Sequence, residues 1–329
     1  MKRRRFLAAT GLLLLSPLDG AAKEQARRRP ARIGLVPDLW EEWRVLLRSA
    51  MLERGWREGP DYVLVVSGIP PGPQIEETVR RVAAAKPDLL YVANTGYALA
   101  ARRLAPEVPI VMVSSGFPVE AGLAASLARP GGTVTGNSAY AGVGIFGKLL
   151  ELLRDAKPDI KRIGILWSYV PPLHPREEIE PAYREVREAA RRLQLAVQIE
   201  EVALPVDLPS ALAALRSAGA DALLVTTGVA LWTEGKRIMQ FALANRLVTI
   251  ADFRWHSDLE PVLAYYPTYD ALTRQAVDYV DRILRGANPG ELPIQQPTKF
   301  ELLVNAKTAR AIGVKLPQSL LLRADQVIE

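Results

Sequence analysis

Apolar positions along the chain follow two spacings, one typical of buried strands and one typical of amphipathic helices. Short runs of branched apolar residues predict strands, and apolar residues three and four positions apart predict the helices between them. In the first part of the chain, strands are expected at 32–36, 62–66, 89–93 and 110–113, with helices at 40–51, 75–85 and 96–104. Strands that alternate with helices in this way form right-handed βαβ units and a parallel sheet.

The same alternation starts again further along the chain. Strands are expected at 162–167, 197–202, 222–226 and 248–250, with helices at 145–153, 179–193, 208–218 and 231–245. The second half therefore predicts a second doubly wound α/β unit. Two such units would form a cleft between the carboxyl ends of their sheets, where open α/β sheets place ligands.

The last third of the chain does not predict a third domain. It contains an extended run at 262–266, a long helix at 269–284, an extended run at 300–304, a short helix at 306–311 and a terminal apolar segment at 320–328. We expect the chain to return to the first lobe and then cross again. The first lobe would comprise residues 31–136 and 267–297, the second lobe residues 137–266 and 298–329, with a hinge of more than one strand.

The stretch from Ser114 to Ser138 interrupts the regular pattern. It contains two prolines and the pair Gly131-Gly132. Glycine admits positive φ, and proline fixes φ and removes a hydrogen-bond donor, so the stretch is too irregular for one long element. We interpret it as the crossing between the lobes, with the hinge at residues 135–138.

The N-terminus has the layout of a secretory signal peptide. Basic residues at 2–5 precede an apolar run at 6–15, and small residues lead to a plausible cleavage site after Ala22. The run is shorter than the ~18 residues that a spanning helix needs. Arg3-Arg4-Arg5-Phe6-Leu7 also fits the twin-arginine pattern, so both export routes stay open. We expect a cleaved signal at 1–22, a basic leader at 23–30 and a periplasmic protein.

The formal net charge of +6 comes from the N-terminal segment. Residues 1–22 and residues 23–30 each carry a net charge of +3, so the rest of the chain is neutral overall. This distribution gives no basic face for nucleic acid. The chain has no cysteine, which excludes disulfides, thiolate metal sites, cysteine nucleophiles and a lipidated cysteine.

No pattern for a cofactor, metal or catalytic site stands out. Residues 142–148 match G-x-G-x-x-G and most of a P-loop, but Leu149 occupies the place of the Mg²⁺-binding hydroxyl. The two histidines are His174, in a proline-rich loop, and His256, which could line the cleft. One alternative stays open, a hydrolase or transferase that pairs Ser114 or Ser115 with His256. We expect no cofactor, no metal and no enzymatic activity.

Polar and aromatic residues directly after the expected strands are candidates for ligand binding, because these loops face the cleft and precede helix N-termini with free N–H groups. Ser114, Ser115 and Thr227 would donate hydrogen bonds, and Asp252 or Arg254 would be the charge partner. The aromatic walls would be Trp40, Trp167 and Tyr169. The full candidate set is Trp40, Asn94, Thr95, Ser114, Ser115, Trp167, Ser168, Tyr169, Thr227, Gly228, Asp252, Arg254 and Tyr265.

Several long motifs resemble one known family. They are GWREG at 55–59, SLARPGGTVTG at 126–136, VDRILRGANP at 280–289, LPIQQPTKFEL at 292–302, Asn305 with KTA at 307–309, and LRADQVI at 322–328. They are similar to motifs of the tryptophan/tyrosine-type substrate-binding proteins of ABC transporters.

This resemblance implies a type I periplasmic binding fold, in which a small ligand such as an aromatic or branched amino acid binds between two lobes. It also implies a monomer that delivers the ligand to an ABC permease and its ATPase. A sensor subunit of a membrane receptor is the alternative within this fold.

Three positions near the expected cleft depart from the family pattern. Phe117-Pro118-Val119 stands where Asp-Pro-Val is usual, and Ser168-Tyr169 stands where Asn-Pro is frequent. Residues 258–261 replace a Gly-Gly-Leu segment. The resemblance therefore predicts the fold and leaves the identity of the ligand open.

Overall fold

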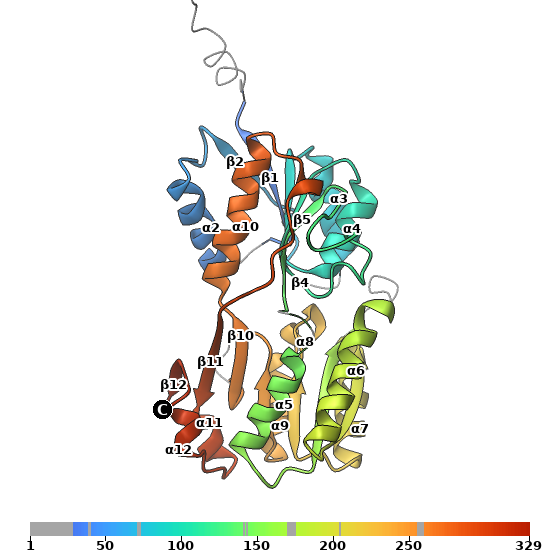
Figure 1. The fold of residues 1–329 in the computed structure, drawn as a ribbon, viewed down its shortest axis with the longest axis vertical. Helices are drawn as coiled ribbons and strands as arrows, with labels where there is room; N and C mark the ends of the chain where they lie inside the picture. The colour runs from blue at the N-terminus through green and yellow to red at the C-terminus, as the bar shows by residue number, and fades with distance from the viewer. Residues whose placement is uncertain are drawn as a thin grey trace, which may run out of the picture.

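A computed structural model describes residues 29–38, 41–70, 74–140, 142, 144–169, 176–203, 205–254 and 260–329. The molecule consists of two α/β lobes, each built around its own sheet, and its long axis runs through both (Figure 1). Trp40, His174, His256 and the expected signal peptide and most of the basic leader lie outside the described residues. Among the described residues, no helix is long and apolar enough to cross a membrane.

The first lobe contains a five-stranded parallel sheet. Its strands, in spatial order, are β2 (Tyr62–Val65), β1 (Ala31–Val36), β3 (Leu89–Val92), β4 (Ile110–Ser115) and β5 (Val134–Ser138). Helices α2 (Glu41–Glu53) and α10 (Tyr269–Leu284) cover one face, and helices α3 (Ile75–Ala84) and α4 (Thr95–Leu104) cover the other (Figure 1). Both faces of the sheet are buried, and β1, β3 and β4 consist mostly of apolar residues.

The second lobe contains a seven-stranded mixed sheet. Its strands, in spatial order, are β12 (Gln326–Ile328), β11 (Phe300–Asn305), β10 (Leu263–Pro267), β9 (Val248–Ala251), β8 (Ala222–Val225), β6 (Arg162–Ser168) and β7 (Ala196–Val202). Strands β10 and β11 run antiparallel, and the other neighbours run parallel.

Helices cover both faces of this second sheet. One face packs on α5 (Ile145–Ala156) and α6 (Arg176–Arg192), and the other on α7 (Leu208–Ser217), α8 (Val229–Thr233) and α9 (Gly235–Ala244). The C-terminal part adds α11 (Ala306–Ala311) and α12 (Gln318–Leu321), and two short 3₁₀ turns lie at Pro205–Asp207 and Pro289–Glu291.

Three connections between described elements pass from one lobe to the other. The first joins β5 to α5, the second joins β10 to α10 through Thr268, and the third runs through residues 296–299 to β11. Figure 1 shows β10 and β11 rising to this waist from the second lobe. The multi-strand hinge expected from the sequence is therefore present.

The structure differs from the sequence-based expectation between residues 114 and 138. Ser114 and Ser115 end β4, and residues 134–138 form β5, a buried strand of the first sheet. The ladder between β4 and β5 shifts register between Met112 and Ser115. Gly136 has φ +123°, and a Cβ there would overlap the Met112 backbone, so glycine allows an irregular strand to pair closely. Similarly, the helix expected at 231–245 is two helices that meet at Glu234.

Candidate functional site

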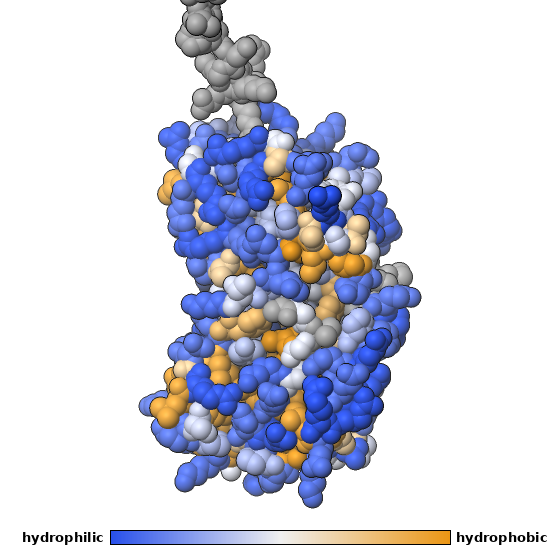
Figure 2. All heavy atoms as spheres, in the orientation of Figure 1, coloured by the Kyte–Doolittle hydropathy of each residue, from blue (hydrophilic) through white to orange (hydrophobic). Residues whose placement is uncertain are grey.

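The carboxyl ends of both sheets meet at the waist of the molecule. The connection after β5 of the first lobe contacts the loop after β9 of the second lobe, where the Tyr140 hydroxyl donates to Asp252 Oδ2 at 3.0 Å. Apolar residues are visible on the surface on both sides of this waist and elsewhere on the second lobe, among mostly hydrophilic residues (Figure 2). The following residues of the predicted cleft are therefore described by their positions and contacts near this waist.

Asp252 is a buried carboxylate with one unpartnered oxygen. It directly follows β9 and exposes 5% of its surface. Its Oδ2 accepts the Tyr140 hydroxyl, whereas Oδ1 is buried without a hydrogen-bond partner. Burial raises the pKa of Asp252 to about 7, against the lowering effect of the hydrogen bond from Tyr140. Such a group calls for a ligand donor, since an unsatisfied buried acceptor destabilises the fold.

Ser115 is the corresponding residue of the first lobe. It ends β4, is fully buried, and its Oγ also lacks a partner. The backbone around it is held firmly, since Gly116 N donates to Thr95 Oγ1 at 2.8 Å and Ser138 Oγ donates to Gly116 O at 3.0 Å. Ser115 and Asp252 thus each leave one buried polar atom unpartnered, at strand ends of opposite lobes.

Asn94 and Thr95 use their side chains inside the first lobe. Asn94 caps α4, with its Oδ1 accepting from Tyr97 N at 3.3 Å, and Thr95 holds the loop after β4. Ser114 is half-buried. These three residues lie at the strand ends that the sequence predicts, but the contacts of Asn94 and Thr95 are those of caps and loop supports.

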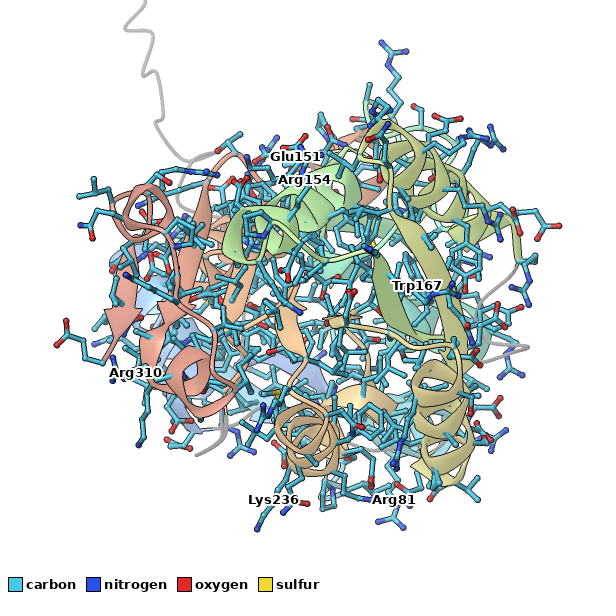
Figure 3. The ribbon with its side chains drawn as sticks, turned by 90° about the horizontal axis from the view of Figure 1, so that it is seen from below. Arg81, Glu151, Arg154, Trp167, Lys236 and Arg310 are labelled. Atoms are coloured by element: carbon cyan, nitrogen blue, oxygen red, sulfur yellow. The ribbon has the colours of Figure 1, made fainter. Side chains whose placement is uncertain are left out.

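Trp167 and Tyr169 lie in the core of the second lobe. Trp167 exposes 4%, and its ring lies 5.0 Å from Phe146 and 4.9 Å from Tyr183. Figure 3 places Trp167 on its strand in the interior, whereas Lys236 and Arg310 lie at the outside of the lobe. Tyr169 is covered by the Arg176 guanidinium at 4.3 Å. Their expected role as cleft walls stays a prediction, and packing is the role that these contacts describe.

The strand ends of β6 and β8 approach each other closely. Ser168 N donates to Thr226 Oγ1 at 3.2 Å, and a Cβ on Gly228 would overlap the Ser168 side chain. Glycine is therefore required at position 228 for this approach. Thr227 is exposed beside it, which leaves its side chain accessible from solvent.

Arg254 and Tyr265 turn toward the strands on the far side of β9. Arg254 Nη1 donates to the Tyr266 hydroxyl at 3.2 Å and to Gln326 Oε1 at 3.3 Å. Tyr265 stacks on Phe300 with ring centroids 5.3 Å apart. Between the two charge partners that the sequence left open, the structure leaves Asp252 with a free acceptor and gives Arg254 protein partners.

Sequence reasoning missed two tyrosines near Asp252, Tyr140 and Tyr269. The Tyr140 ring lies 5.2 Å from Phe117 and 5.1 Å from Phe146. Tyr269, at the start of α10, forms an edge contact with Trp43 at 5.3 Å. Burial raises the pKa of Tyr269, and the negative charge of Asp252 adds to the rise, which places this first-lobe residue near the second-lobe carboxylate. The sequence pattern predicts no strand before Tyr140, so the search for aromatic residues after strands could not find it.

The alternatives that involve metal or histidine gain no support from the described residues. Within them, no group of three or more His, Asp or Glu side chains could hold a metal ion. His256, which would pair with Ser114 or Ser115 in a hydrolase, and Val143 of the glycine-rich match lie outside the described residues.

Comparison with known proteins shows the family to which the chain is similar. A family described as ABC transporter substrate binding protein matches residues 73–328. The tyrosine-binding protein of Clostridioides difficile (strain R20291) is 23% identical over 268 residues, which span 81% of this chain and 75% of that protein.

Solved structures share the fold. The ABC domain in complex with L-Trp from Streptococcus pneumoniae has a TM-score of 0.78 at 19% identity, covering 91% of this chain and 100% of that one. A ligand-free, open substrate-binding protein with adhesive properties from Clostridium difficile has a TM-score of 0.63 at 21% identity, covering 91% and 99%. The predicted type I periplasmic binding fold and the resemblance stated from the motifs are confirmed. The chain belongs to the family of ABC transporter substrate binding proteins.

Proposed function

We propose that this protein captures an amino acid between its lobes and delivers it to the permease of an ABC importer. The observation that carries the proposal is Asp252 Oδ1, a buried and unpartnered carboxylate oxygen where the two lobes meet. An ammonium group is the natural partner of such an oxygen, because a charge-assisted hydrogen bond compensates the burial of both ions. The unpartnered Ser115 Oγ supplies a donor for a carboxylate on the opposite lobe.

The aromatic side chains around Asp252 favour an amino acid with an aromatic or branched side chain. Tyr140 and Tyr269 flank the carboxylate, and the relatives include a tyrosine-binding protein and an L-Trp complex. A micromolar complex needs about 8 kcal/mol, of which one buried aromatic side chain supplies roughly 1.5–3 kcal/mol. Polar contacts to Asp252 and Ser115 must therefore supply most of the affinity.

We also infer where the protein works and how it acts. The basic and apolar N-terminal segment would direct export to the periplasm. A ligand that contacts both lobes favours their closed arrangement only as far as it binds that arrangement better than the open one. The hinge connections allow such a closure, and the closed form would present itself to the permease.

A thermal-shift screen of the mature protein tests this function. L-tryptophan, L-tyrosine, L-phenylalanine and L-leucine are compared with sugars, nucleobases and inorganic anions. A ligand at 100 times its Kd adds about 2.7 kcal/mol to the stability of the folded protein, so the melting temperature rises. The proposal expects the rise with at least one aromatic or branched amino acid, and its reduction in Asp252→Asn. The control Asp159→Asn makes the same change at an exposed loop position and should bind normally. A rise with sugars or anions alone would refute the proposal.

A further inference from the structure

Tyr140 occupies a fixed position between the lobes. It exposes 7% of its surface, and its ring is packed against Phe117 and Phe146. Its backbone is held by Ser138, whose Oγ accepts from Tyr140 N at 3.3 Å. The hydroxyl therefore reaches Asp252 Oδ2 from a residue whose ring and backbone are both held in place.

This contact makes the two carboxylate oxygens of Asp252 different. Oδ2 accepts the Tyr140 hydroxyl, and Oδ1 keeps its acceptor capacity inside the buried site. A guanidinium binds a carboxylate best as a fork that uses both oxygens, whereas a compact ammonium needs one. With Oδ2 occupied, the geometry favours the ammonium.

Among the described residues, the groups that face Asp252 include no cation directed at its carboxylate. Tyr140 approaches from the connection after β5, Tyr269 from α10, and the backbone N–H of Thr227 from the loop after β8. Arg254, on the same loop as Asp252, turns its Nη1 to Tyr266 and to Gln326. A bound ligand would therefore bring the countercharge that the described surroundings of Asp252 do not supply.

We propose that Tyr140 is a specificity-determining residue, which holds Asp252 Oδ2 so that the site accepts a primary ammonium through Oδ1 and discriminates against guanidinium and amide groups. This inference rests on the proposed capture of an amino acid. Ligand binding is then coupled to the release of one proton. An Asp252 that is protonated in the free site must release its proton to solvent as the ammonium enters. The Tyr140 hydroxyl stabilises the carboxylate form, so it also sets the pH range in which the ligand binds.

Isothermal titration calorimetry with a matched set of ligands tests this inference. The probes are L-tryptophan, N-acetyl-L-tryptophan and Nα-amidino-L-tryptophan, together with L-tyrosine and its two corresponding derivatives. Each is titrated at several pH values from 5.5 to 9. The wild-type protein should bind the free amino acid at least about tenfold more tightly than the N-acetyl derivative, which has lost the cationic donor to Asp252. It should also prefer the free amino acid to the amidino derivative, because the guanidinium fork finds only one free oxygen. Its affinity should fall as the pH drops below about 7, by up to tenfold per pH unit.

Tyr140→Phe keeps the ring and removes the hydroxyl. The pH at which affinity is lost should then rise, because the carboxylate has lost a stabilising donor, and the amidino derivative should gain relative to the free amino acid. Tyr183→Phe is the control, since Tyr183 is another buried tyrosine of this aromatic cluster but donates to Glu201 at 3.0 Å. Its pH profile should match that of the wild type.

The outcomes separate this inference from the proposed function. If a free amino acid binds but Tyr140→Phe leaves its pH profile and the ligand ratios unchanged, the role of Tyr140 is refuted and the capture of an amino acid stands. If N-acetylated and free amino acids bind equally well, Asp252 is not the ammonium site. If no aromatic or branched amino acid binds at any pH, both proposals fail.

Discussion

Replacing Asp252 by asparagine should stabilise the ligand-free protein at alkaline pH, although it removes the proposed ammonium receptor. The carboxylate is buried with an unpartnered oxygen, so its ionised form is costly in the absence of ligand. Asparagine keeps an oxygen for the Tyr140 hydroxyl and carries no charge. Asp252 would thus serve ligand binding while lowering the stability of the ligand-free protein.

The expected size follows from the pKa of Asp252, which rises from 3.8 to about 7 in the folded protein. Between about pH 4 and pH 7 the folded protein holds a proton that the unfolded chain has released, so the free energy of unfolding falls as pH rises. A pKa difference of about 3 corresponds to about 4 kcal/mol, reached above pH 7. The new amide N–H groups also need partners, so we expect a gain of about 1–3 kcal/mol for Asp252→Asn at pH 8.

Urea denaturation of the ligand-free protein at pH 4.5, 6 and 8 measures this difference. The advantage of Asp252→Asn should be small at pH 4.5 and largest at pH 8, while Asp159→Asn should follow the wild type at each pH. A variant that is no more stable than the wild type at pH 8, or one whose advantage does not grow with pH, would refute the reasoning. In that case Asp252 is ionised and well satisfied in the free protein.

Three further substitutions test the packing around the site. Gly136→Ala should lose more than about 2 kcal/mol in urea unfolding, because φ is +123° and the new Cβ would overlap the Met112 backbone; Gly132→Ala, with open space around it, is the control, and an equal effect of both would contradict this account. Trp167→Ala should lose about 3–5 kcal/mol, as expected for a buried aromatic side chain; unchanged stability with weakened ligand binding would instead make Trp167 a cleft wall. Glu185→Gln should raise the melting temperature at pH 8 but not at pH 4, because burial raises the pKa of Glu185 to about 7; an equal change at both pH values would exclude this cause.

Much of the fold could be predicted from periodicity, since strands buried on both faces appear as apolar runs and the helices between them show an apolar face. Strand β5 was not predicted, because its buried positions include polar side chains. Thr135 Oγ1 donates to Leu292 O at 2.7 Å, and Asn137 Nδ2 donates to Val113 O and Leu272 O at 3.1 and 2.8 Å. Their partners are distant in the sequence, so a hydropathy pattern shows such residues as a loop.

The sequence could point to the loops that form the candidate site, but it could not show the contacts within them. Loops after parallel strands are placed together by topology, which is why the sequence pointed to Ser115 and Asp252. It could not show that Arg254 finds protein partners at Tyr266 and Gln326, or that Tyr140 reaches Asp252 across 112 positions of the chain. Whether a polar side chain is free for a ligand depends on such distant contacts.

A crystal structure with the amino acid that gives the largest thermal shift would test the central claim most directly. The account predicts that the ligand lies between the lobes, with its ammonium nitrogen about 2.7–3.2 Å from Asp252 Oδ1 and the Tyr140 hydroxyl still on Oδ2. A ligand whose ammonium binds elsewhere, with Asp252 Oδ1 still unpartnered beside it, would contradict the account.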